Sequence, residues 1–100
     1  MFFLLAFDSE CFIYDVDYKD NNVDELKGIT SAGLCRQECQ KNLKCKMFAW
    51  VSDEFRTADY RQNCYLKNVS MEMSKMVTDL GVVSGLRHCR KYYNLFDCVS

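Results

Sequence analysis

Seven cysteines in 100 residues constrain the fold of this chain more than any other feature. That is several times the ordinary usage, and it is typical of a secreted scaffold held together by disulfides. Three of the cysteines lie in "SAGLCRQECQKNLKCKMFAW" (31–50), with the spacing C-x3-C-x5-C. Cysteines in such a cluster can hold a metal, supply a reactive thiol or form disulfides. Each alternative makes a different demand on the rest of the sequence.

The sequence lacks the residues that a structural zinc site or a catalytic thiol requires. Structural zinc sites use two cysteine knuckles, or one knuckle and two histidines, whereas the single histidine here is His88. Three cysteines plus His88 would leave Cys11, Cys64 and Cys98 unexplained. In a strand, His88 and Cys89 would point to opposite faces, so His88 is badly placed as a base for that thiol.

The remaining residues show no carboxylate pair and no nucleophile–base pair at a telling spacing. We therefore expect no metal, no cofactor and no enzymatic activity.

Disulfides agree better with the local periodicity. Thr30 or Ser31 is a good N-cap, and a helical period follows it. The apolar face of the predicted helix carries Ala32, Cys35, Cys39 and Leu43, and its outer face carries Arg36, Gln37, Gln40 and Lys41. Cysteines one turn apart on a helix rarely bond to each other, so Cys35 and Cys39 each need a partner outside the helix. Proximity favours Cys39 with Cys45, Cys35 with Cys64, and Cys11 with Cys89, but spacing alone leaves other connectivities open.

The other segments mostly predict strands. "CFIYDVDY" (11–18) alternates as a half-buried strand does, and "KMFAWVS" (46–52) is apolar on both faces, as in a central strand. "NCYLKN" (63–68) and "GVVSGLRHC" (81–89) predict two more strands. The segment 69–80 is ambiguous: Met73, Met76, Val77 and Leu80 fit a helical face, but an irregular flap fits equally well. This order of elements predicts an α+β class, a mostly antiparallel sheet with one helix packed on it.

These stretches together resemble the PAN/apple domain family, and their residues are most similar to those of the apple modules of apicomplexan microneme adhesins. The resemblance rests on the C-x3-C-x5-C run followed by an aromatic strand, on the later C-x-L-K strand, and on "GVVSG". It implies a curved sheet of about five strands cradling one α-helix. It also implies nested bridges: Cys11–Cys89, Cys35–Cys64 and Cys39–Cys45. The domain would span 11–89, with an extension or signal remnant at 1–10 and a tail at 90–100.

The resemblance implies a binding module that is secreted, or stored in a microneme-type organelle if the source is apicomplexan. Its expected partner is a host-surface carbohydrate or glycoprotein. The alternative is an assembly module that forms a homodimer or docks to a partner chain in an adhesin or a protease zymogen. The net charge is −1 and the pI about 5.7, so we expect no nucleic-acid partner. No run is apolar and long enough for a transmembrane helix.

The loop 53–62 and the strand after it are the first place to look for a ligand site. They combine hydrogen-bonding groups with aromatic rings, which suit the hydroxyls and the apolar face of a sugar. The candidate residues are Arg56, Asp59, Tyr60, Arg61, Tyr65 and Lys67. The ordinary alternative is a solvated loop with surface charge.

Two further features are independent of that loop. Asn68-Val-Ser is an N-glycosylation sequon. Cys98 is the odd cysteine in the tail, and an unpaired cysteine in a secreted protein suggests a disulfide-linked dimer or a bridge to a neighbouring domain.

Overall fold

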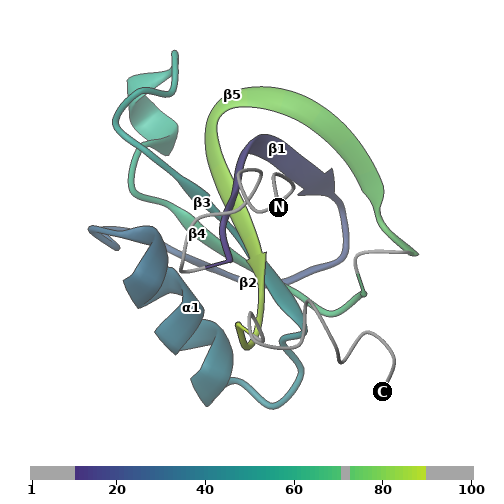
Figure 1. Cartoon of the computed structure of the whole chain (residues 1–100). Helices are drawn as coiled ribbons and strands as arrows, with labels where there is room; N and C mark the ends of the chain where they lie inside the picture. Colours follow the sequence, from purple (N-terminus) through teal and green to yellow (C-terminus); the bar gives the residue numbers. More distant parts are fainter. Residues whose placement is uncertain (1–10, 71–72, 90–100) are drawn as a thin grey trace.

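In the part of the chain that the structure describes, a five-stranded antiparallel sheet carries one α-helix on one face (Figure 1). This computed structural model describes residues 11–70 and 73–89. The elements are β1 (Ile13–Lys19), β2 (Asn22–Leu26), α1 (Ala32–Lys41), β3 (Met47–Val51), the 3-10 turn η2 (Ala58–Tyr60), β4 (Cys64–Lys67) and β5 (Lys75–Leu86). The strands follow the order β1-β5-β3-β4-β2, and every neighbouring pair is antiparallel. The predicted α+β class, with about five strands and one helix, is confirmed.

Helix α1 begins as predicted but ends earlier. The Ser31 hydroxyl accepts a hydrogen bond from the Leu34 N–H at 3.1 Å, which is the expected N-cap. Asn42 ends the helix, and its N–H donates to the Cys39 carbonyl. The prediction that Leu43 lies on the buried face is wrong, because Leu43 is 94% exposed. The chain has to turn here to bring Cys45 back to Cys39, and the turn carries Leu43 off the helix.

The prediction that Arg36 lies on the outer face is also wrong. Its guanidinium is buried between two aromatic rings, 4.8 Å from the centre of Phe12 and 5.3 Å from that of Phe48. Its Nε–H donates to the Leu86 carbonyl at 3.1 Å. A Cβ atom on Gly85 would come within 2.9 Å of this guanidinium, so the missing side chain on β5 makes room for it. A planar cation that stacks on rings and donates several hydrogen bonds can be buried where a helical pattern alone predicts exposure.

The second half of the segment 69–80 is neither a helix nor an irregular flap, because β5 already begins at Lys75. Pairing with β1 overrides the helical spacing of its apolar residues. The register jumps within this pair: two positions along β1, from Val16 to Tyr14, correspond to five along β5, from Thr78 to Val83. The extra residues of β5 bend it, and Figure 1 shows it arching away from the other strands with β1 alongside.

Three disulfides tie these elements together: Cys11–Cys89, Cys35–Cys64 and Cys39–Cys45. They are the pairs that the family resemblance implied. Cys35, Cys39, Cys45 and Cys64 are all buried in the main core between α1 and the sheet, together with Phe48 and Leu66. Cys35–Cys64 and Cys39–Cys45 therefore hold the helix against the middle strands. Cys11–Cys89 joins the two ends of the domain.

Replacing Arg36 by Lys should lower the free energy of unfolding by about 2–3 kcal/mol, although the charge is kept. The lysine cannot stack as a plane between two rings, nor can it reproduce the guanidinium's hydrogen bonds. Denaturant unfolding without reductant measures the change. Gln37→Lys, one residue along on the exposed face, is the control and should stay within about 0.5 kcal/mol of the parent. Equal stability of the two variants would contradict this role for Arg36.

The disulfides should differ in their contribution to the free energy of unfolding, because they close loops of different length. On the chain-entropy model, the 78-residue separation of Cys11–Cys89 corresponds to about 4.5 kcal/mol, and the six-residue separation of Cys39–Cys45 to about 2.4 kcal/mol. The double alanine variant of the first pair should therefore unfold at lower denaturant than that of the second. The reverse order would mean that burial in the core, and not loop closure, sets their contributions.

Candidate functional site

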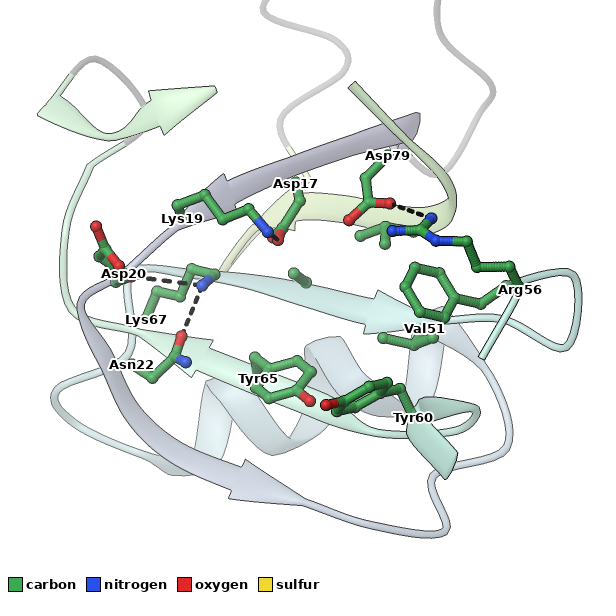
Figure 2. A pocket seen from close by; sticks show the side chains of 13 residues that line it. Asp17, Lys19, Asp20, Asn22, Val51, Arg56, Tyr60, Tyr65, Lys67 and Asp79 are labelled. Atoms are coloured by element: carbon green, nitrogen blue, oxygen red, sulfur yellow. Dashed lines mark hydrogen bonds and ion pairs between the residues drawn. The ribbon is translucent and has the colours of Figure 1, made fainter. Parts of the chain in front are cut away.

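A cleft of about 350 Å³ lies on the face of the sheet that α1 does not cover (Figure 2). Side chains alternate along a strand, so Tyr65 and Lys67 of β4 face this cleft while Cys64 and Leu66 pack toward the helix. The residues that line it are Asp17, Lys19, Asp20, Asn22, Ala49, Val51, Phe55, Arg56, Tyr60, Tyr65, Lys67, Asp79 and Val82.

The floor of the cleft is a second, smaller core. Ala49, Val51, Phe55 and Val82 are buried together, and the Tyr65 ring packs against them. The Phe55 loop lies close against the bend of β5, where Gly81 has φ +93° and a Cβ would come within 2.7 Å of the Phe55 nitrogen. Glycine at this bend therefore lets the loop that carries Phe55 form one wall of the cleft.

Lys67 closes one end of the cleft. Its ammonium donates to the Asn22 side-chain oxygen at 2.6 Å and to the Asp20 carbonyl at 3.4 Å. Asp20 and Asn21 both have positive φ, which gives the tight turn between β1 and β2. The Asn68 N–H donates to the Asn21 carbonyl at 3.0 Å, so the end of β4 holds this turn in place through both side chain and backbone.

Four of the other charged side chains of the cleft form two ion pairs. Arg56 donates to Asp79 at 3.1 Å and lies over the Phe55 ring at 4.7 Å, while Lys19 lies 3.4 Å from Asp17. Within the lining, the aspartates and the cationic side chains are equal in number. The cleft is therefore polar at its ends but has no large excess of either charge.

Burial lowers the pKa of the Lys67 ammonium below its usual value, and the nearby Asp17 carboxylate opposes this shift. Lys67 is only 3% exposed, and none of the ion pairs found among residues 11–70 and 73–89 includes it. Its hydrogen bonds are to a neutral amide and a backbone carbonyl. The cleft thus contains a desolvated cation without a direct carboxylate contact in the described part of the chain.

Four of the six residues predicted from the sequence line the cleft: Arg56, Tyr60, Tyr65 and Lys67. The other two do not. The Arg61 Nε–H donates to the Phe55 carbonyl at 2.8 Å and so helps to hold the loop. Asp59 is exposed in η2, away from the lining. A ligand role for the predicted residues stays a prediction.

The far wall of the cleft was not predicted. It is formed by Asp17 and Lys19 of β1, the turn after them, and Asp79 of β5. In the alternation of 11–18, Asp17 lies on the side opposite Phe12, Tyr14, Val16 and Tyr18, but that pattern equally fits a face in water. Asp79 lay in the segment that we expected to be a helix or a flap. Only the pairing of β1 with β5 brings these residues opposite the predicted loop.

Other predicted features lie outside the cleft. Asn68 is exposed just after β4, as glycosylation requires, and its modification stays a prediction. Cys98 lies outside the described residues, so its predicted bridge is not seen. In the described part of the chain, no group of three or more histidine, cysteine or acidic side chains is placed to hold a metal ion. The helices described there are too short or too polar to cross a bilayer.

The lowered pKa of Lys67 predicts the sign of a pH effect on stability. Between its folded pKa and the value of 10.5 in an unfolded chain, the unfolded state binds more protons. The free energy of unfolding should therefore rise with pH across this window in the parent, relative to Lys67→Met. Cys98→Ser in every variant prevents thiol exchange at high pH. The exposed Lys44→Met is the control for the loss of a lysine outside the cleft. A difference between Lys67→Met and the parent that does not change with pH would contradict the burial of a charged amine.

Comparisons with known proteins agree with this architecture. A model of the PAN domain family matches residues 9–93. A solved structure with a similar fold is the A5 domain of TgMIC4, a Toxoplasma microneme adhesin, in complex with lacto-N-biose. The two sequences are 23% identical, the match covers 75% of this chain and 93% of that one, and the TM-score is 0.59. The match to the family model, together with the sheet, the helix and the three nested disulfides, shows that this chain belongs to the PAN domain family.

Proposed function

We propose that this domain is an extracellular recognition module and that its cleft binds a sugar unit of a host-surface glycan or glycoprotein. The observation that carries the proposal is the composition of the cleft, in which tyrosine rings lie beside hydrogen-bonding groups on an open face of the sheet (Figure 2). Its volume, about 350 Å³, is at the small end of ligand sites, which suits one or two sugar rings.

A sugar ring has an apolar face of C–H groups and a rim of hydroxyls, and the cleft offers a counterpart to each. The rings of Tyr65 and Tyr60 provide amphipathic surfaces for the apolar face. Lys67, Asn22 and Asp17 provide donors and acceptors for the hydroxyls at the other end. Most of these polar groups are already held by hydrogen bonds or ion pairs, so little side-chain ordering is left to oppose binding.

The family and the similar structure support the proposal. PAN domains are binding modules, and we expect no enzymatic activity here. The TgMIC4 domain was solved with lacto-N-biose, which makes that disaccharide the first probe for this chain. Three disulfides favour an oxidising environment, in agreement with a secreted or extracellular domain, and storage in a microneme-type organelle is the corresponding proposal for an apicomplexan source.

Lacto-N-biose added to isotope-labelled protein should shift the NMR signals of the cleft in a saturable way, with the largest changes at Tyr65, Lys67 and Asn22. Tyr65→Ala should weaken binding by about tenfold or more, because it removes a ring that packs on the sugar. Lys44→Ala changes an exposed residue outside the cleft and should bind like the parent.

Shifts confined to the helix side would contradict the proposed site. The absence of binding to lacto-N-biose and to an array of host-type glycans would contradict the carbohydrate function itself. A dimer in light scattering that Cys98→Ser converts to a monomer would then favour the assembly alternative.

A further inference from the structure

We propose that Asn63 sets the direction of the Tyr65 hydroxyl, so that Tyr65 donates a hydrogen bond into the cleft and, beside Lys67, selects a ligand that presents acceptor oxygens. Asn63 is then a positioning residue and Tyr65 a specificity-determining one. The direction of the hydroxyl is a property of the free protein, and only the statement about the ligand rests on the proposed function.

Asn63 is fixed by its surroundings. It is 2% exposed and immediately precedes β4. Its Nδ2 lies 3.0 Å from the Tyr65 hydroxyl oxygen and 3.4 Å from Glu25 Oε2 on β2. An ionised carboxylate can only accept hydrogen bonds, so the side of the Asn63 amide that faces Glu25 has to be the NH₂ group. With the amide turned around, the Asn63 oxygen would face the Glu25 carboxylate oxygen, and Asn63 itself is buried away from water.

This arrangement leaves one direction for the tyrosine proton. A hydroxyl has a single proton, and the Tyr65 oxygen already accepts a hydrogen bond from Asn63. The Tyr65 O–H must therefore donate to something else. Figure 2 shows the hydroxyl end of Tyr65 directed toward that of Tyr60, and both residues line the cleft.

Lys67 is a second hydrogen-bond donor on the same face of β4. It lies two positions after Tyr65 on the same face, and its ammonium is 6.0 Å from the centre of the Tyr65 ring. An ammonium has three N–H groups, and the described residues provide two acceptors for it, on Asn22 and Asp20. The third N–H has no acceptor among the described residues, so it remains for the ligand. Tyr65 and Lys67 thus contribute two donors to one cleft, the Lys67 ammonium at the Asn22 end and the Tyr65 hydroxyl toward Tyr60 (Figure 2).

Groups that can only donate a hydrogen bond to the ligand select by atom type. They suit ring oxygens, glycosidic oxygens and acetamido carbonyls, which accept hydrogen bonds and cannot donate them. A ligand hydroxyl fits here only if it turns a lone pair toward the protein. Replacing such a hydroxyl by fluorine keeps an acceptor, although a weaker one, whereas replacing it by hydrogen removes the acceptor altogether.

The direction of the hydroxyl can be tested without any ligand. In the free protein, the Asn63 side-chain amide should show a proton shifted downfield and slow to exchange with water. Tyr65→Phe keeps the ring and removes the acceptor, so that proton should move upfield. An Asn63 amide that does not respond to Tyr65→Phe would overturn the proposed direction. Tyr60→Phe is the matched control, and it should leave the Asn63 amide unchanged.

The selection can be tested with lacto-N-biose and its monodeoxy and deoxyfluoro analogues. At the contacting position, the fluoro analogue should bind the parent better than the deoxy analogue does. In Tyr65→Phe this preference should disappear, and lacto-N-biose itself should bind about fivefold more weakly, the effect of one neutral hydrogen bond. Unchanged affinity for lacto-N-biose in Tyr65→Phe would overturn the selection. Equal binding of the two analogues at every position, together with weaker binding to Tyr65→Phe, would support an acceptor that is a ring, glycosidic or acetamido oxygen.

The two tests separate the claims. Failure of the parent to bind lacto-N-biose and the glycan array would count against the proposed function and the selection together. The NMR test on the free protein would still decide the direction of the hydroxyl.

Discussion

The attachment of α1 to the sheet by two disulfides is the constraint on which the rest of the structure depends. Cys35–Cys64 joins the helix to β4, and Cys39–Cys45 turns the chain from the helix into β3. Together they commit one face of the sheet to the main core. Because strand side chains alternate, the other face then receives every second residue of β3 and β4, among them Tyr65 and Lys67. The arrangement of the core thus determines which residues are available for recognition.

The opposite face becomes a cleft because β5 bends. Its first half pairs with β1 alone, whereas its second half also pairs with β3. The bend at Gly81 brings β5 against the Phe55 loop, and the β1 side chains then face the loop across the sheet. Charged residues far apart in the sequence, such as Asp17 and Arg56, come to line one small space. The recognition proposed here therefore depends on a backbone feature as much as on the polar side chains.

The sequence predicted the parts of the molecule that are governed by local rules. An N-cap at Thr30 or Ser31, the helical spacing of Cys35 and Cys39, and the alternation in β4 are visible without any structure. Arg36 was placed wrongly because its burial depends on rings from two distant segments and on the missing side chain of Gly85. The strand character of 75–80 was missed because it comes from pairing with β1. For the same reason, only the side of the cleft formed by the 53–62 loop and β4 was predicted, because the pairing of β1 with β5 builds the far wall.

The central claim is that the helix-free face holds a sugar against Tyr65. Intermolecular nuclear Overhauser effects between the ring protons of bound lacto-N-biose and the side chains of the protein test it most directly. The account predicts contacts from the sugar's C–H protons to the aromatic protons of Tyr65 and Tyr60. Contacts to side chains of α1 or of the 42–45 turn, with none to Tyr65, would contradict it.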